Sequence, residues 1–397
     1  MLLTNAILSN GDSVAVRTDG DRIVEVGSTV VAVENEQVVD LEQRILLPAF
    51  AEPHAHLDKA LTADRVPNPA GDLLGAIVAW SAHRVTLSAD DIIARATRAV
   101  KILAANGTTA IRTHVDVTSD VGLSGLEALM QVKDAVEPFM TIQIVGLIGR
   151  PVTGPAGADH RALLRDALAA GLDIVGGAPH IDNDSVAASR FLMELAGEAG
   201  TPLDLHTDEN LDLSSLDLEV LANDVISSGF TESVTAGHCV SLGIQPENVQ
   251  ERVAARVAES GISVVVLPQT NLFLQSRGQG VAPVRGLTAL AALEAAEARV
   301  AGGADNLQDP FCTVGRGDAL ETAALLVMAG HLTAELAFDY VSNRSRAVLG
   351  LEPVSVAAGS KADLVAIRAG SIREAVAMAP GDRVVVKNGL VVHGAGV

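Results

Sequence analysis

The sequence predicts an α/β protein built on a closed parallel (β/α)8 barrel, the TIM barrel, with a small β-sandwich beside it. Three observations lead to this prediction. Short apolar segments recur roughly every 30 residues through the middle of the chain, stretches of helical period separate them, and both ends show a different, alternating pattern. Parallel neighbouring strands need a long crossover connection, so strand and helix segments in alternation are typical of βα units.

Eight segments fit the barrel strands. The first is the apolar run that leads into His56, and the other seven follow at intervals that leave room for a helix. They are residues 45–56, 109–116, 141–148, 173–181, 203–209, 234–240, 263–270 and 299–305. One intervening helix has clear ends, because Ser88 can cap its start and Asn106-Gly107 can end it. Eight strand and helix repeats predict a closed barrel.

The two ends of the chain do not follow the barrel pattern. Short alternating stretches such as residues 22–26, with Asn-Gly and Asp-Gly turn signals between them, predict strands. In the tail, residues 383–392 predict a hairpin around Asn388-Gly389. We therefore assign residues 1–47 plus 358–397 to one small β-sandwich and residues 48–357 to the barrel.

Composition narrows the class of partner. The chain has 397 residues, and its net charge of −21 argues against binding to a nucleic-acid backbone, which requires a Lys/Arg face. Two cysteines are too few for a disulfide framework, and the first residues lack the basic and apolar regions of a signal peptide. No apolar run reaches the roughly 20 residues of a membrane span. We expect a cytoplasmic protein that acts on a small molecule, without nucleic-acid or membrane partners.

Polar side chains gather where the predicted strands end. His54 and His56 lie two apart and therefore face the same side of a strand, while His206, His238 and Asp305 come at the ends of later segments. Taken singly, each histidine is more often a core or surface residue. As a set, they meet at the carboxyl rim of the barrel, where barrel enzymes carry their chemistry. Imidazoles with one carboxylate suit Zn²⁺ or Fe²⁺ with a position left for water, so the set predicts a metal site.

This arrangement resembles the amidohydrolase superfamily over nearly the whole chain. Several stretches are also similar to bacterial cytosine deaminases. They are residues 52–58, 112–117, 143–145, 175–180, 206–209 and 271–275. The His-Leu-Asp-Lys form of the first motif is similar to hydrolases that act on s-triazine derivatives as well.

The resemblance implies a ligand set of His54, His56, His206 and Asp305 around one divalent metal ion, Zn²⁺ or Fe²⁺. Binuclear members of the superfamily bridge two metals with a lysine at the end of strand 4, and the segment 173–181 contains no lysine. The resemblance therefore implies a mononuclear site. Its metal would lower the pKa of a bound water from 15.7 toward about 7 and supply hydroxide as the nucleophile.

The catalytic residues that this implies are Glu209, His238 and Asp305. Asp305 would take the proton of the water, and His238 would orient that water and stabilise developing charge, acting beside the metal as a catalyst more than as a ligand. Glu209, three residues after His206, repeats the deaminase motif and would protonate a ring nitrogen. The expected reaction is the hydrolytic deamination of a planar N-heterocycle, with release of ammonia.

The substrate pocket departs from the cytosine deaminase pattern. Those enzymes carry a glutamine after strand 3 that reads the pyrimidine, and the alignment places Gly149 there; Phe311 stands where they have a tryptophan. A pocket discriminates through the polar partners it offers, so cytosine itself is doubtful. We expect substrate contacts from Gly149, His180, Gln269, Asn271 and Phe311, although loop or core hydrogen bonding would explain each of them as well. Residues 62–80 and 275–285 are expected to shape the entrance as loops.

Two other functions remain open at this stage. The same metal could hydrolyse a cyclic amide or a triazine-type C–N bond, or the chain could be a non-catalytic scaffold of the amidohydrolase type. Scaffold relatives usually lack metal ligands, and this chain keeps the whole set. We also expect a homo-oligomer, although the sequence does not count subunits.

Overall fold

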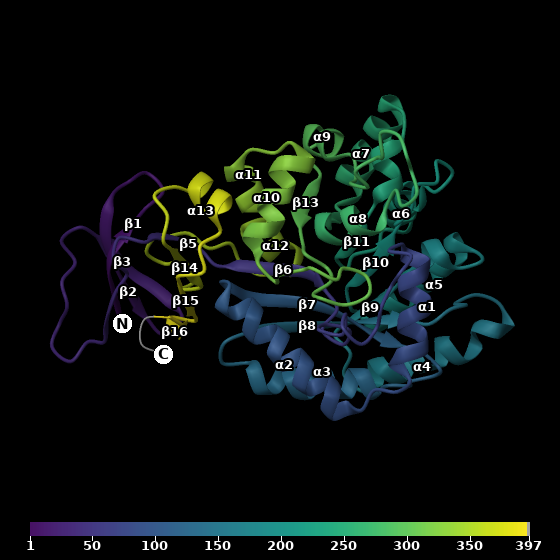
Figure 1. The fold of residues 1–397 in the computed structure, drawn as a ribbon, viewed down its shortest axis with the longest axis horizontal. Helices are drawn as coiled ribbons and strands as arrows, with labels where there is room; N and C mark the ends of the chain where they lie inside the picture. The colour runs from purple at the N-terminus through teal and green to yellow at the C-terminus, as the bar shows by residue number, and fades with distance from the viewer. Residues whose placement is uncertain (395–397) are drawn as a thin grey trace.

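The structure is a computed structural model that describes residues 1–394, and it contains two sheets. The strands from both chain ends form one sheet at one side of the molecule, beside the barrel (Figure 1). Residues 395–397 of the predicted sandwich segment lie outside the described residues.

The barrel consists of eight parallel strands in chain order. They are β6 (Phe50–Ala55), β7 (Thr108–Val117), β8 (Thr141–Ile148), β9 (Ile174–Gly177), β10 (Leu203–Thr207), β11 (Val234–His238), β12 (Ser263–Val266) and β13 (Arg299–Gly302). The ring closes between β13 and β6, where Asp305 N donates to His54 O over 3.0 Å. Each of the eight predicted segments overlaps one of these strands, which confirms the fold class.

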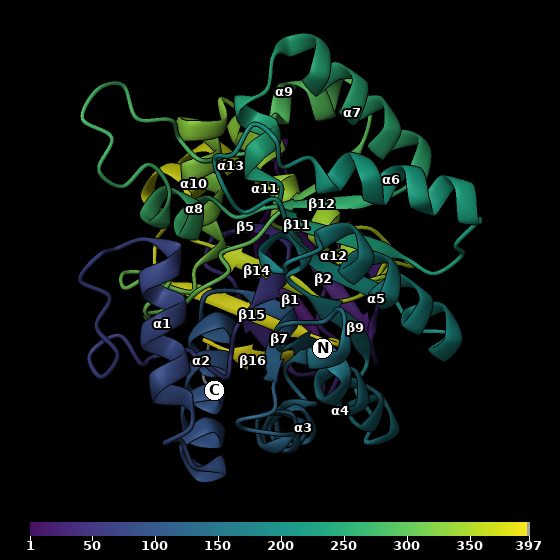
Figure 2. The same ribbon diagram turned by 90° about the vertical axis from the view of Figure 1, so that its right-hand side faces the viewer.

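Helices surround the barrel strands (Figure 2). They are α1 (Leu73–Arg84), α2 (Ala89–Ala105), α3 (Ser124–Val136), α4 (Ala158–Ala169), α5 (Ser185–Ala199), α6 (Asp217–Ser228), α7 (Glu247–Ser260), α8 (Pro268–Leu274), α9 (Leu290–Ala295), α10 (Ala319–Gly330), α11 (Ala334–Tyr340) and α12 (Asn343–Val348), with 3-10 turns at Pro155–Gly157, Pro179–Ile181 and Val240–Ile244. Helix α2 begins as predicted, since the Ser88 hydroxyl accepts from Asp91 N, and it ends before Asn106.

The other sheet joins strands from both ends of the chain. Its strands are β1 (Leu2–Ile7), β2 (Ser13–Asp19), β3 (Arg22–Gly27), β4 (Val38–Asp40), β5 (Ile45–Pro48), β14 (Leu364–Ile367), β15 (Arg383–Lys387) and β16 (Leu390–His393), and α13 (Ile372–Met378) connects β14 to β15. The order is β16-β15-β14-β5-β1-β2-β3, with β4 beside β1. Strand β5 therefore pairs with β14, and β15 and β16 form the predicted hairpin.

The small sheet has an apolar cluster on one face, while Ile45, Val365 and Val385 on its strands belong to the main core of the barrel. In the small sheet, Leu3, Val16, Leu46, Leu364 and Val384 pack in one cluster, which joins the N-terminal and C-terminal strands. Burial of this kind contributes about 25 cal/mol per Å² of apolar surface, so the strands from the two chain ends stabilise one another. The first apolar run is thus divided: β5 completes the small sheet and β6 opens the barrel. The predicted domain boundaries at residues 47 and 358 stay a prediction.

Candidate active site

Three imidazoles and one carboxylate converge at the carboxyl rim of the barrel. His54 and His56 come from the end of β6, His206 from β10, and Asp305 from the residues after β13. The Nε2 atoms of His54 and His56 each lie 3.2 Å from Nε2 of His206. Asp305 Oδ1 lies 3.2 Å from His56 Nε2 and 3.7 Å from His54 Nε2. All four side chains are buried, so this is an enclosed cluster of ligand-type atoms.

The chemistry of this cluster fits a divalent metal ion. Burial, reinforced by the neighbouring histidines, lowers the pKa of His54 and of His206 well below the usual value for imidazole, so both rings are neutral and each offers a lone pair. No hydrogen-bond donor within residues 1–394 pairs with Asp305 Oδ1. Buried polar atoms are normally paired, and nitrogen lone pairs that face one another and a carboxylate need a cation between them.

His238 and Glu209 lie next to this cluster. His238 Nε2 is 3.9 Å from Asp305 Oδ2, and its Nδ1 lies 3.0 Å from Asn271 Oδ1 and 3.5 Å from Glu209 Oε1. If Nδ1 carries the proton and donates it to Asn271, the lone pair of Nε2 faces the cluster. Burial, with the charge of Asp305 adding to it, raises the pKa of Glu209 well above its ordinary value. Burial therefore favours the protonated form of Glu209.

A cavity of about 210 Å³ opens above these groups. Its floor is formed by His56, His206, His238, Glu209 and Asp305. The walls are contributed mainly by α1, the end of β8, the turn after β9 and the loop after β13. Residues of these walls include Leu73, Ile77, Trp80, Ile148, Gly149, Arg150, His180, Ile181 and Phe311. Pockets of this kind, largely apolar with a few convergent polar groups, bind small planar ligands.

The five predicted substrate residues divide into two groups. Gly149, His180 and Phe311 line the cavity, and His180 Nδ1 contacts His206 O over 3.0 Å. Among the described residues that line the cavity, Gln269 and Asn271 are not present. The Gln269 amide donates to Thr322 Oγ1 over 2.7 Å, while Asn271 contacts His238. The structure thus gives Asn271 a partner in the catalytic cluster, while Gln269 contacts α10.

Gly149 packs directly against His160. A Cβ atom built on Gly149 would lie 2.6 Å from Nε2 of His160, which belongs to α4. The His160 ring is held by Ser119 Oγ at 3.2 Å and by Pro151 O at 3.1 Å. A longer side chain at position 149 would have to displace His160, so the two residues together define this wall.

Sequence reasoning missed Trp80, Arg84 and Asp116, which form one wall of the cavity together with Lys59. Trp80 Nε1 donates to Asp116 Oδ2 over 2.7 Å, Lys59 Nζ donates to Asp116 Oδ1 over 2.8 Å, and Arg84 also binds this carboxylate. Burial opposes ionisation of Asp116, yet the charges of Lys59 and Arg84 hold its pKa below the ordinary value. A usable signal was available, because Trp80 is the only tryptophan of a chain with 2% aromatic residues.

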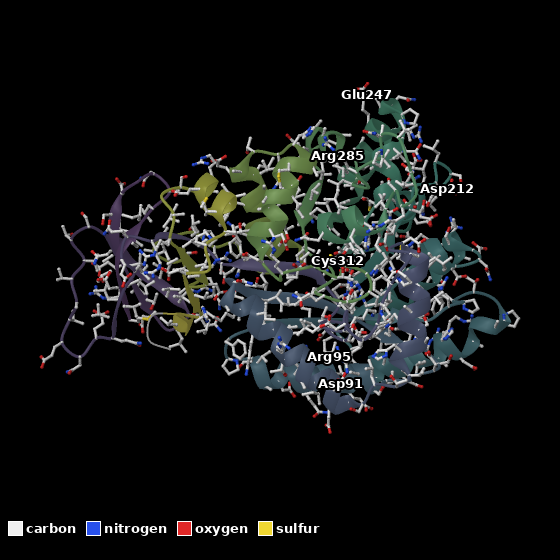
Figure 3. All side chains as sticks on the ribbon, viewed as in Figure 1. Asp91, Arg95, Asp212, Glu247, Arg285 and Cys312 are labelled. Atoms are coloured by element: carbon white, nitrogen blue, oxygen red, sulfur yellow. The ribbon has the colours of Figure 1, made fainter. Side chains whose placement is uncertain are left out.

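The turn that carries Lys59 is fixed from outside the barrel. Arg95 of α2 donates to the carbonyl oxygens of Asp58 and Ala60, at 2.8 Å each, and Asp91 binds Arg95 in turn over 2.7 Å. Figure 3 shows Asp91 and Arg95 close together on this helix. Helix α2 therefore positions the chain directly after the two metal-ligand candidates on β6.

A family model described as the amidohydrolase family matches residues 126–394. The chain belongs to this family. The amidohydrolase is 35% identical over 360 residues to a pterin deaminase of Rhizobium rhizogenes (strain K84), covering 89% of this chain and 82% of that relative. These matches confirm the superfamily and the deaminase-like branch predicted from the motifs.

Two solved structures resemble this amidohydrolase over its whole length. The 5-methylcytosine deaminase of Klebsiella pneumoniae, liganded with 5-fluorocytosine, aligns with a TM-score of 0.90 and 29% identity, covering 100% of this chain and 98% of that one. The N-isopropylammelide isopropylaminohydrolase of Burkholderia multivorans aligns with a TM-score of 0.87 and 30% identity, with coverages of 100% and 98%. Within residues 1–394, every helix is too short or too polar to cross a membrane.

Proposed function

We propose that this amidohydrolase catalyses the metal-dependent hydrolytic deamination of a planar N-heterocycle that bears an amino group. The observation that carries the proposal is the position of Glu209, a buried acid whose carboxyl oxygen lies 3.5 Å from His238, on the floor of the same cavity as the His and Asp cluster. Deamination needs such a pair, an acid for the ring nitrogen and a site that activates water. The pterin deaminase and the 5-methylcytosine deaminase among its relatives support the same reaction.

We infer that His54, His56, His206 and Asp305 hold one divalent ion, Zn²⁺ or Fe²⁺. Strand β9, at the position where a bridging lysine would stand, has the sequence Ile-Val-Gly-Gly, which supports a single ion. Such an ion would supply a water molecule that loses a proton near neutral pH. The Nε2 and Oδ1 atoms already lie close together in the protein, so little rearrangement is needed for binding.

The residues around the cluster can then move the protons of the reaction. Asp305 takes one proton from the attacking water, and His238 orients that water through its Nε2 atom. Glu209 donates its proton to the ring nitrogen next to the amino-bearing carbon, which makes this carbon electrophilic. The oxygen of the water bonds to the carbon, the C–N bond breaks, and ammonia leaves. One proton of the water ends on the amino group, which leaves as ammonia. The other returns to Glu209 and replaces the proton that Glu209 gave to the ring.

The walls of the cavity suggest how the ring is held. Phe311 can stack on a planar ring, and His180 offers an Nε2 atom without a partner among the described residues. Burial lowers the pKa of His180 to about 4, so this ring is neutral at pH 7. Gly149 leaves its backbone open to the cavity. These contacts, a homo-oligomeric state and a cytoplasmic location remain proposals.

An ammonia-release screen tests the proposed reaction. The purified protein, loaded with Zn²⁺ or Fe²⁺, is assayed against amino-substituted pyrimidines, triazines, pterins and purines. We expect ammonia from at least one of these classes, and none from the protein stripped by a chelator. Opening of cyclic amides with no ammonia from any amino-heterocycle would reject the deaminase reaction.

A second candidate is hydrolysis of a triazine-type C–N bond that carries an alkyl substituent. The N-isopropylammelide hydrolase relatives favour it, and so does the apolar wall of the cavity formed by Leu73 and Ile77 of α1. The product separates the two candidates, because this reaction releases an alkylamine in place of ammonia.

A further inference from the structure

We propose that Glu52 is a positioning residue, which clamps β6 to the chain after β13 and so fixes Asp305 relative to His54 and His56. The proposal rests on the metal site inferred above. Among the described residues that line the cavity, Glu52 is not present, so it acts through the ligands and does not touch the substrate.

The clamp lies where the barrel has the least backbone pairing. Strands β7 and β8 are paired from Ala110↔Thr141 to Val117↔Ile148. Between β6 and the chain after β13, by contrast, residues 1–394 contain a single isolated bridge, Ala55↔Asp305. The backbone alone therefore holds this seam weakly, although it carries three of the four ligand candidates.

The Glu52 carboxylate spans this seam. Its Oε1 accepts from His54 N and from Ala304 N, at 3.1 Å each, and its Oε2 accepts from Ala304 N at 2.9 Å. One buried side chain thus binds a backbone amide on either side of the gap. Gly303 allows this approach, because a Cβ atom there would lie 2.6 Å from Glu52 Oε1.

Asp305 needs such a restraint because of its backbone. Its φ angle is +68°, in the left-handed region that a residue with a Cβ atom rarely adopts. The amide before it, Ala304 N, is held by Glu52, and its own amide is held by His54 O. A strained residue persists where its surroundings restrain it, and here the restraint also directs Asp305 Oδ1 toward the Nε2 atoms.

The affinity for a metal ion, measured apart from activity, tests this role. Zn²⁺ alone is titrated against a competing chelator for the wild type, Glu52→Ala and Glu52→Gln, and the visible absorption of the Co²⁺-loaded proteins reports the ligand geometry. We expect binding about 10- to 100-fold weaker in Glu52→Ala, with an altered Co²⁺ spectrum. The Zn²⁺ affinity of Glu52→Gln should lie between those of the wild type and Glu52→Ala, because its amide keeps one acceptor oxygen but turns an NH₂ group toward Ala304 N.

Asp173→Asn is the matched control. Asp173 also binds a backbone amide across two barrel strands, Ile144 N at 2.8 Å, but it lies before β9, at the end of the barrel away from the ligands. We expect Asp173→Asn to lower the thermal midpoint and to leave the Zn²⁺ affinity and the Co²⁺ spectrum unchanged.

The outcomes are distinct. If both Glu52 variants lose thermal stability but bind Zn²⁺ and Co²⁺ as the wild type does, Glu52 is an ordinary structural residue and the positioning role is rejected. If Glu52→Ala does not fold, the Zn²⁺ affinity and the Co²⁺ spectrum of Glu52→Gln test the positioning role instead. A wild type that binds neither metal would reject the metal-dependent function itself, a result that does not depend on any Glu52 variant.

Discussion

At the scale of single residues, two buried carboxyl groups in one cavity have different surroundings, which suit the different roles proposed for them. Asp305 Oδ1 lies 3.2 Å from His56 Nε2, within the histidine cluster. Glu209 lies beside His238, and burial raises its pKa well above the ordinary value, which favours the protonated form. Environments that differ in this way separate an acid from a base without different residue types.

Glu209→Gln should therefore keep the metal and lose turnover. The amide occupies the same space but has no acidic proton, so we expect kcat to fall by about 10²- to 10⁴-fold. Ammonia release and metal content are measured on the same preparation. The control is Glu219→Gln, which changes an acid of α6 that pairs with Arg252 of α7. This variant should behave as the wild type. Normal turnover in Glu209→Gln would remove its role as the acid.

Removing a ligand candidate should remove the metal. In His206→Ala the two 3.2 Å contacts to His54 and His56 disappear, and the proposed site loses one of its four ligands, so it should bind the ion more weakly. We expect about one Zn²⁺ or Fe²⁺ per wild-type chain and almost none in the variant, by elemental measurement. His331→Ala, at the exposed end of α10, is the control. A variant that retains full metal content would exclude His206 from the ligand set.

At the scale of elements, the ends of the barrel strands could be predicted from the sequence, but the walls of the cavity could not. His54, His56 and His206 are fixed by the barrel topology, which brings the carboxyl ends of all its strands together. Gln269 and Asn271 are different: the sequence suggested a strand through residue 270, whereas the chain turns into α8 at Pro268. Helical geometry rotates successive side chains by about 100°, so these two amides reach different neighbours.

Helix α1 is another wall of the cavity that the sequence did not predict. Residues 62–80 are rich in Pro and Gly and suggested a loop, but from Leu73 onward they form a helix whose Asp72 cap accepts from Gly75 N. This helix places Trp80 against Asp116. The prolines that suggested a loop, Pro67 and Pro69, lie before Leu73, whereas the helix itself is rich in Leu and Ala, which favour helical structure.

Trp80→Phe should lower both stability and substrate binding. The substitution keeps most of the apolar contact but removes the 2.7 Å hydrogen bond to a buried carboxylate, which costs about 1–3 kcal/mol. Urea unfolding measures the first effect and KM the second. Val78→Ala, on the exposed face of the same helix, should change the unfolding free energy by less than about 0.5 kcal/mol. Equal effects of both variants would contradict the role of this contact.

The stabilising effect of Asp116 should depend on pH in one direction. Because its pKa in the folded protein is lowered from 3.8, its ionised form contributes stability that is complete above the unfolded value and is lost as pH falls through the folded one. At pH 7, Asp116→Asn should be less stable than the wild type by about 1–3 kcal/mol, because Lys59 and Arg84 each lose one of two carboxylate partners and keep Asp58 and Asp120. Unfolding free energies measured from pH 7 to below pH 3 should show a constant gap that begins to close only as pH falls through the unfolded value of 3.8. A gap that widens at low pH would contradict the lowered pKa.

At the scale of the whole molecule, buried ion pairs connect the small sheet to the barrel. Arg383 of β15 donates to both carboxylate oxygens of Asp318, at 2.8 and 2.7 Å, and also binds Asn106 O. Lys387 of the same strand reaches Thr141 Oγ1 at the start of β8. The alternating pattern of the tail predicted these strands, but it could not show which of their charged residues would turn toward the barrel.

Arg383→Ala should uncouple the unfolding of the small sheet from the unfolding of the barrel. Removing one member of a buried pair leaves Asp318 without its partner and costs about 3–5 kcal/mol. We expect the thermal unfolding of the variant to begin earlier and to separate into two transitions, measured by calorimetry. Arg368→Ala, which breaks exposed pairs with Glu42 and Asp382, should leave a single transition near that of the wild type. A single, unshifted transition in Arg383→Ala would show that other contacts connect the two parts.

The pairing of β5 with β14 also bears on the order in which a growing chain acquires its structure. Strand β5 leads through Ala49 directly into β6, yet its partner is made only after every barrel strand has left the ribosome. Until then, one edge of β5 stays open, and an open edge invites pairing with other chains. A message truncated before residue 364 would therefore yield a product with all metal-ligand candidates present but a permanently exposed strand edge, and so a substrate for chaperones and proteases.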